Sequence, residues 1–475
     1  MPPMPPRMEG WRAGDKRMKS VAFVFVAIVG LAYPVGADSR LPSQELESLA
    51  GARTRVVWCR QITGEGDPFA TNAWYSLMAL DTQEGSERVL VPGPRSIRKP
   101  LLSPQGDWVV YTDYQRGRVM KVPFSGGIPI ELADGHACDV WLDPTSGRLW
   151  VYAVSGRLET EAFLGSPVVR FPFDDPTKRE VVWSKTPAST DNFQVSDDGT
   201  RAVGLFPWPQ AGWAGLPDGE LHRIARGCWP SRAVGAPGLV AVFDGAHRNW
   251  LLHDLRADRR WTVALNTAPD MEGAEVYHPR WGRPAHLVAV SGPYLAGQGR
   301  TRVGFGGPQV EIFVGRLADD FSKVVRWVRI THNQQADYFP DVWAVAQVPT
   351  APTSTVAALP PQHAARSGRW IVEAKLVGTT RTPTLAEIQP YRQALVVFEY
   401  EVVRVLEPAG RSPAGRILVL HWAIRDRKPV APRHRIGDQV RLTLEPYDAH
   451  PELEGERIVM EMKSQGRPLY YEVQP

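Results

Sequence analysis

The sequence predicts an all-β protein, with a six-bladed β-propeller followed by a small β-barrel or sandwich; a seven-bladed ring is the alternative. Three observations carry this prediction. Glycine and proline are abundant, with 42 and 43 residues in a chain of 475, and they separate many short β-branched and aromatic runs, which favours turns between strands over long helices. A turn that opens a strand recurs through the first two thirds of the chain, and a second group of strands follows a proline-rich stretch.

Residues 1–37 have the pattern of a signal peptide. Basic residues precede an apolar stretch from Val21 to Ala32, and Val35-Gly36-Ala37 supplies small residues for cleavage before Asp38. The apolar stretch is about 12 residues long, whereas a bilayer core needs roughly 20. We therefore expect cleavage and no stable membrane span afterwards; a retained membrane helix is the alternative, and Met8 and Met18 are alternative starts.

The charge balance argues against a polyanionic partner. Removing residues 1–37 takes five basic and two acidic side chains from totals of 55 and 51, which leaves 50 against 49. A nearly neutral mature chain gives no electrostatic case for nucleic acid. About 440 mature residues exceed one ordinary core, so one large repeat domain or at least two domains are expected.

The three cysteines, Cys59, Cys138 and Cys228, suggest neither a disulfide framework nor a zinc site. Their number is odd, no CxxC pair occurs, and the spacings are wide. We expect them to be buried as small hydrophobic residues.

The clearest internal repeat unit is Leu102-Ser103-Pro104-Gln105-Gly106-Asp107-Trp108, a tight turn that leads into an alternating strand. Related segments are Trp141–Gly147, Val195–Thr200, Trp229–Ser231, Pro279–Gly282 and Phe339–Trp343. Their spacing of roughly 35 to 60 residues is close to that of four-stranded propeller blades with loop insertions.

This pattern resembles the TolB-type propeller repeat, in which a Ser-Pro-Asp-Gly-like turn joins two inner strands, over about residues 48–347. Gln105 stands where the family has Asp, and the Trp229 and Pro279 copies lack the full turn. We expect residues 38–347 to form the propeller, with the strand at 339–345 returning to the first blade to close the ring.

Residues 348–368 are rich in Pro, Ala, Thr and Ser and are predicted to be a linker. Beyond it, residues 369–475 are predicted to form a small all-β domain of five or six strands. The predicted strands are Trp370–Leu376, Ala394–Leu406, Arg416–Ile424, Gln439–Leu444, Arg457–Met462 and Leu469–Val473. Their rhythm is similar to the OB-fold modules of netrin and tissue-inhibitor type; an unspecified small β-domain is the alternative.

A candidate ligand site follows from the position of polar residues in the repeat. In a propeller the innermost strands line the axis, so residues just before equivalent turns converge at one end of the channel. These residues are His136, Asp139, Asp191, Asn192, Cys228, Trp229, His278, Arg280, Asp337 and Asp341. Trp141, Trp281 and Trp343 offer faces on which sugars could stack. The alternative is that these polar groups only hydrogen-bond neighbouring blades and channel waters.

A second candidate patch combines aromatic and charged residues in two neighbouring blades: Trp208, Trp213, Asp244, His247 and Arg248. Asp244 and His247 are residue types that ligate metals, but their spacing defines no common face. Packing of the tryptophans between blades is the alternative.

No GxSxG, HExxH, P-loop or complete GxGxxG motif occurs. The leading hypothesis is a non-catalytic, monomeric binding or scaffolding protein, periplasmic or secreted, that engages an envelope protein or a carbohydrate and needs no cofactor. The rival is a carbohydrate-active lyase or hydrolase with a divalent cation or a histidine in the channel, for which His136, His278, Arg280, Asp337 and Asp341 are the candidate residues.

Overall fold

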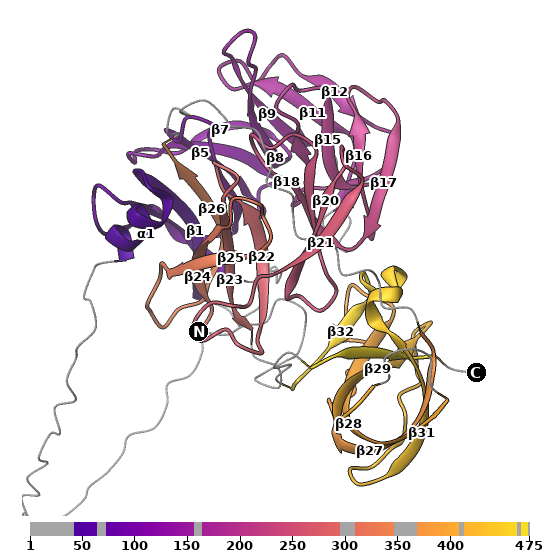
Figure 1. Ribbon diagram of the computed structural model, residues 1–475. Helices are drawn as coiled ribbons and strands as arrows, with labels where there is room; N and C mark the ends of the chain where they lie inside the picture. The colour runs from indigo at the N-terminus through magenta and orange to yellow at the C-terminus, as the bar shows by residue number, and fades with distance from the viewer. Residues whose placement is uncertain are drawn as a thin grey trace, which may run out of the picture. The chain divides into compact units, whose positions relative to one another are not determined.

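The computed structural model describes residues 42–63, 73–155, 164–294, 309–345, 368–407, 413–462 and 467–473 (Figure 1). The predicted signal peptide and almost all of the predicted linker lie outside these ranges. The described residues belong to one compact unit.

Six four-stranded antiparallel sheets form the predicted propeller. The first blade contains β26 (Asp337–Ala344), β1 (Thr54–Thr63), β2 (Trp74–Asp81) and β3 (Glu87–Arg95). The second contains β4 (Ile97–Leu102), β5 (Trp108–Asp113), β6 (Arg118–Pro123) and β7 (Ile130–Asp134). The third contains β8 (His136–Leu142), β9 (Leu149–Val154), β11 (Val168–Pro172) and β12 (Glu180–Trp183).

The fourth blade contains β14 (Gln194–Val195), β15 (Arg201–Leu205), β16 (Gln210–Gly215) and β17 (Leu221–Arg226). The fifth contains β18 (Cys228–Arg232), β19 (Leu239–Phe243), β20 (Asn249–Asp254) and β21 (Arg259–Ala264). The sixth contains β22 (Glu275–Trp281), β23 (Leu287–Tyr294), β24 (Glu311–Leu317) and β25 (Val324–Arg329). Two short strands, β10 (Leu164–Gly165) and β13 (Ala188–Ser189), pair separately.

The ring closes as predicted, because β26 from the end of the repeat region pairs with β1 from its beginning. This pairing removes the two free edges that an open row of blades would leave. Six blades, rather than seven, are therefore formed.

The predicted turns act as contacts between blades. At the best copy, Ser103 Oγ accepts hydrogen bonds from the backbone N–H groups of Asp107 and Trp108, both at 3.1 Å, and Gly106 takes a left-handed φ of +74°. The Trp343 ring packs against Gly106, and its Nε1 donates to Pro104 O at 2.9 Å. A tryptophan from one blade thus packs on the turn of the next blade and forms a hydrogen bond with it.

The same arrangement recurs between the third and fourth blades, where Trp141 packs on Gly199 and donates to Asp197 O at 3.2 Å. Trp281 is also buried and lies against Trp250, with ring centroids 4.4 Å apart. These three tryptophans, expected as stacking faces for sugars, pack instead against other parts of the propeller; Trp141 and Trp281 are buried and Trp343 is half-buried.

The C-terminal region is a closed five-stranded barrel, which is one of the two forms, barrel or sandwich, that the sequence predicts. Its strands are β27 (Trp370–Gly378), β28 (Ala394–Glu407), β29 (Arg416–Arg425), β31 (Gln439–Pro446) and β33 (Leu469–Glu472). Around the barrel the order is β27, β28, β29, β33, β31 and back to β27, with β29 and β33 parallel. β30 (Lys428–Pro429) and β32 (Arg457–Val459) extend the sheet, and two short 3₁₀ helices, η1 (Tyr447–Ala449) and η2 (Pro451–Leu453), follow β31.

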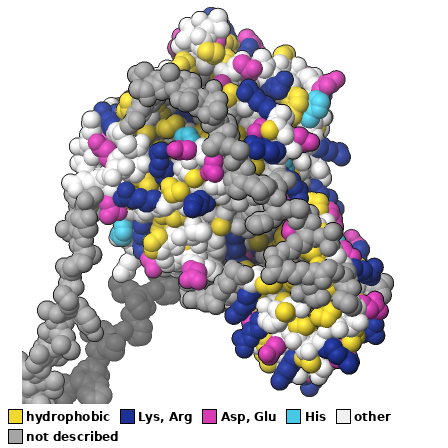
Figure 2. Space-filling model, viewed as in Figure 1, with side chains coloured by type: hydrophobic (Ala, Val, Ile, Leu, Met, Phe, Trp, Pro, Cys, Tyr) yellow, Lys and Arg dark blue, Asp and Glu magenta, His cyan; other side chains and the backbone are white. Residues whose placement is uncertain are grey.

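The one α-helix of the described residues, α1 (Pro42–Ala50), buries Leu46 and Leu49 against the propeller core. Among the described residues, no helix has the length and apolar character to span a bilayer. On the face drawn in Figure 2, basic and acidic side chains are interspersed, as the near-neutral charge balance leads one to expect.

Candidate ligand site at the channel mouth

The site is built by a bulge that recurs in the innermost strands of four blades. Each bulge contains a residue with positive φ followed by proline: Lys99-Pro100, Trp229-Pro230, His278-Pro279 and Phe339-Pro340. The strand register shifts at all four points. Proline cannot donate to a ladder and is tolerated at bulges, while positive φ is strained for residues other than glycine and clusters at functional sites.

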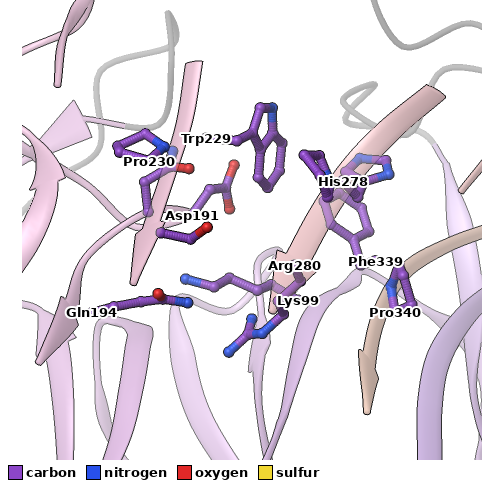
Figure 3. Close-up of a pocket in the computed structure, with 12 residues that line it drawn as sticks. Lys99, Asp191, Gln194, Trp229, Pro230, His278, Arg280, Phe339 and Pro340 are labelled. Atoms are coloured by element: carbon purple, nitrogen blue, oxygen red, sulfur yellow. The ribbon is translucent and has the colours of Figure 1, made fainter. Parts of the chain in front are cut away.

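The bulges surround a small cavity that draws residues from five blades (Figure 3). Its lining is Lys99, Asp191, Asn192, Gln194, Trp229, Pro230, Ser231, His278, Pro279, Arg280, Phe339 and Pro340. The cavity volume is about 20 Å³, which is room for one or two water-sized groups. Five of the predicted channel residues, Asp191, Asn192, Trp229, His278 and Arg280, therefore share one space.

Lys99 and Asp191 place opposite charges in this space with little solvent. The Lys99 ammonium donates to the carbonyl oxygens of Cys138, at 2.9 Å, and Thr190. Burial, with a smaller contribution from the Arg280 guanidinium, lowers the pKa of Lys99 to about 8. Burial also raises the pKa of Asp191, and its Oδ1 is buried without a hydrogen-bond partner among the described residues.

The other two titratable residues of the cavity are held by neighbours. Arg280 Nε lies 2.8 Å from Asp341 Oδ1. His278 Nδ1 lies 2.8 Å from Ser291 Oγ, and burial holds the pKa of His278 well below its ordinary value. His278 is therefore a neutral imidazole at pH 7 and a weak base.

Two of the predicted acidic residues connect blades. Asp341 Oδ2 accepts from the backbone N–H of Leu102 in the next blade at 2.7 Å, and Asp139 Oδ2 accepts from that of Val195 at 2.8 Å. Gln194 occupies the equivalent position in the fourth blade, and its Oε1 accepts from the N–H of Arg232 at 2.9 Å. The alternative of hydrogen bonding between blades thus describes Asp139 and Asp341.

His136 and Asp337 lie outside the cavity lining. The His136 ring packs on Tyr114, with centroids 4.9 Å apart, and burial lowers its pKa to about 4. Asp337 accepts from Trp58 Nε1 and Arg60 Nε, both at 2.9 Å, and from Asn333 Nδ2 at 2.7 Å. Within the described ranges, no group of three His, Cys, Asp or Glu side chains could hold a metal ion.

No family model and no curated protein matches the chain. Among solved structures, TolB from Acinetobacter baumannii matches at 13% identity over 63% of this chain and 70% of that chain, with a TM-score of 0.42. The structure of a nidogen/laminin complex matches at 11% identity over 62% of this chain and 99% of that chain, with a TM-score of 0.42. The six-bladed propeller predicted from the repeat is confirmed by the sheets themselves.

Sequence reasoning missed Lys99, Gln194 and Phe339. The repeat was aligned on the turn, whereas these residues lie a few positions upstream of it. A signal was present, because four innermost strands carry an X-Pro pair at a similar distance before the turn. That pair marks the bulge from which the cavity residues project.

The second predicted patch does not form one surface. Trp213 stacks on His222, with ring centroids 4.0 Å apart, on the outer part of the fourth blade. Trp208 and His247 contact Tyr391, and His247 Nε2 lies 3.1 Å from its hydroxyl.

The two remaining residues of the patch, Asp244 and Arg248, form hydrogen bonds inside the protein. Asp244 Oδ1 accepts from the backbone N–H groups of Arg248 and Asn249, at 3.0 and 3.1 Å. Arg248 Nη2 donates to Gly273 O and Met460 O, at 2.9 and 2.8 Å. Both side chains are therefore engaged in hydrogen bonds within the protein.

Proposed function

We propose that the chain is an exported, non-catalytic binding protein of the bacterial cell envelope, whose propeller engages a protein or carbohydrate ligand at the channel mouth. The observation that carries the proposal is the cavity itself. It gathers a half-buried Trp229, the buried Lys99 and an Asp191 oxygen that has no hydrogen-bond partner among the described residues, and all four of its bulges hold a residue with positive φ next to proline. Export is supported by the charged and apolar leader at residues 1–37.

The rival function, a polysaccharide lyase or hydrolase, has one observation in its favour: His278 and Arg280 line the same cavity. A lyase needs a base whose pKa lies near the working pH. His278 has its pKa far below that range, and the Arg280 Nε is taken by Asp341.

The barrel is proposed to act as an adaptor module of OB type. Its closed five-stranded form and its strand order, with β29 and β33 parallel, support that assignment. A barrel with its own core gives the chain a second surface for a partner.

The test of the binding function compares two tryptophan variants. Trp229→Asn removes the half-buried ring at the cavity and keeps a residue that tolerates positive φ. Trp213→Asn removes a half-buried ring on an outer strand and is the matched control. Binding of envelope proteins and of a glycan panel is measured by biolayer interferometry with the purified protein.

We expect at least one ligand to bind wild type and Trp213→Asn with equal affinity. Trp229→Asn should bind the same ligand at least tenfold more weakly, a loss of about 1.4 kcal/mol in binding free energy. Equal binding by all three proteins would place the ligand elsewhere. Release of unsaturated or reducing sugar ends from the panel by wild type would instead favour the enzyme.

A further inference from the structure

The segment that leads from the end of β29 to the start of β31, residues 425–438, concentrates positive charge on the barrel. We call it the basic loop. Its two carboxylates are Asp426 and Asp438. Its five cations are Arg425, Arg427, Lys428, Arg433 and Arg435. Arg392 adds a sixth cation beside the loop, since its carbonyl oxygen accepts from the Arg427 N–H at 3.3 Å. The nearly neutral total charge of the chain thus hides a local excess.

The six cations have no acidic partner. All six residues are exposed, and within the described ranges none of them forms an ion pair. Arg425 contacts only a ring, lying 5.7 Å from the centroid of Trp422. Arginines on the propeller surface behave differently, as Arg148 does in its pair with Asp174 at 2.9 Å. A surface of like charges without partners is stabilised by an anion from outside the chain.

The hairpin of β29 and β30 holds a cation where glycine is favoured. Asp426 and Arg427 form its two-residue turn, with φ of +49° and +62°. Such turns favour Asp-Gly, because both residues need positive φ. This backbone conformation is strained for a residue that carries a Cβ. The chain therefore keeps the charge of Arg427 at a cost in stability, and residues strained in this way cluster at functional sites.

Two large apolar side chains are exposed among these cations. Ile436 is 68% exposed and Val430 is 42% exposed. A soluble polyanion gains nothing from such groups, whereas the boundary between lipid headgroups and acyl chains accepts them beneath the charged layer. Cations and apolar side chains in one loop therefore favour an anionic bilayer over a soluble polyanion.

The basic loop is attached to the barrel, so its side chains are presented without a folding step. His434 Nδ1 lies 3.1 Å from the hydroxyl of Tyr400, which is buried in the barrel core. The Gly437 N–H donates to Leu376 O at 2.8 Å. A preformed loop loses less conformational freedom on binding than a free segment of the same composition.

We infer that the basic loop binds the anionic headgroups of a phospholipid bilayer, with Ile436 and Val430 entering the headgroup region. The contact is peripheral, because it uses one loop and no membrane-spanning segment. None of these residues lines the channel cavity, so the inference concerns a second site and its test is independent of the channel ligand.

The experiment is co-sedimentation of the mature chain, from Asp38 onwards, with vesicles of phosphatidylcholine alone or mixed with phosphatidylglycerol. Residues 1–37 are left out because their basic and apolar stretches would bind vesicles by themselves. Affinity is measured at low salt and again at high salt, because salt screens contacts between exposed charges.

Three loop variants are compared with two controls on the propeller. The loop variants are Arg427→Gly, Arg435→Gln and Ile436→Ser. The controls are Arg223→Gln, at an exposed arginine that forms no ion pair within the described ranges, and Ile128→Ser, at a side chain 87% exposed. Glycine suits the positive φ of Arg427, so Arg427→Gly should resist urea at least as well as wild type and separates lost binding from lost folding.

We expect wild type to bind the mixed vesicles at least tenfold more tightly than phosphatidylcholine alone, and high salt to weaken this binding. Arg427→Gly and Arg435→Gln should each weaken it about fivefold, equivalent to about 1 kcal/mol per cation near an anionic bilayer. Ile436→Ser should weaken it at least about threefold, because an apolar group no longer leaves water. Both controls should bind as wild type does.

Equal binding to the two kinds of vesicle would overturn the inference, as would loop variants that bind like their controls. Dextran sulfate tests the competing class of partner. If it binds wild type and Ile436→Ser equally while mixed vesicles bind neither, the loop serves a soluble polyanion and the inference fails. If Ile436→Ser loses affinity for the mixed vesicles alone, the bilayer is supported.

Discussion

Replacing Asp337 tests whether this buried carboxylate serves the fold or the ligand. Its side chain is fully buried on β26 and accepts hydrogen bonds from Trp58 and Arg60 on β1, the strand that completes ring closure. Breaking a buried ion pair costs about 3–5 kcal/mol. Arg60 keeps a second partner, because it forms a bidentate pair with Glu87 at 2.8 Å. We therefore expect Asp337→Ala to lower the free energy of unfolding by about 3 kcal/mol, the lower end of that range.

Asp337→Asn should cost less, about 2 kcal/mol, because the amide oxygen can still accept from Trp58 while the charge opposite Arg60 is lost. Urea unfolding followed by tryptophan fluorescence measures both. With a slope of about 3 kcal/mol/M for a domain of this size, the alanine variant should unfold about 1 M earlier. Asp319→Asn, at a side chain 92% exposed, is the matched control and should shift by less than about 0.5 kcal/mol.

Binding of the channel ligand by the Asp337→Asn protein tests whether the role of Asp337 is purely structural. Folded Asp337→Asn protein should keep wild-type affinity for the channel ligand, because Asp337 does not line the cavity. A variant with unchanged unfolding but lost binding would return Asp337 to the functional site, as the sequence alone proposed.

Three further predictions follow from buried groups. Burial lowers the pKa of His247 to about 4, below its ordinary 6.5, so the free energy of unfolding should be highest above pH 6.5 and should fall by up to about 3 kcal/mol as the pH drops towards 4. His247→Asn should make the free energy of unfolding less dependent on pH over that range. Gly106→Ala should cost about 2–4 kcal/mol in urea unfolding, because a Cβ there would lie 2.5 Å from the Trp343 ring at positive φ, whereas Gly117→Ala, with open space around it, should cost about 1 kcal/mol. All three cysteines are free and buried, so a thiol reagent should modify none of them in the folded protein and all three in denaturant; rapid reaction of one without denaturant would contradict the packing.

The blade pattern was predictable because it is local. Ser103 and Gly106 form a turn whose geometry depends on a few neighbouring residues, and the repeat of that turn predicts the ring. The strands of the barrel were predictable for the same reason, since each is a short run rich in β-branched and aromatic residues. Neither prediction needed contacts between distant segments. The alternation over 396–406 predicts one buried face, and this is wrong, because every residue from Ala394 to Tyr400 is buried.

Which residues line the cavity depends on their exact positions along the innermost strands. The sequence predicts those positions less well than it predicts the strands themselves. Asp337 and Asp341 were assigned to one neighbourhood, but four residues of an extended strand span about 13 Å, so one lies at the cavity level and the other does not. Lys99 stands in a run of otherwise buried residues, and a lysine there is normally expected at the surface. Its burial depends on carbonyl groups of two other blades, which no local pattern reveals.

The cavity arises where the rule that connects the blades is broken. In three blades the residue after the bulge position, Asp139, Gln194 or Asp341, accepts a hydrogen bond from the next blade. In the sixth blade the equivalent residue is Arg280, a donor, which binds back to Asp341 instead. Asp341 then serves two neighbours, and the remaining donors of Arg280 face a space in which Lys99 also has an unused N–H. The replacement of an acceptor by Arg280 in the sixth blade therefore brings a charged donor into the cavity lining, beside Lys99 from the second blade.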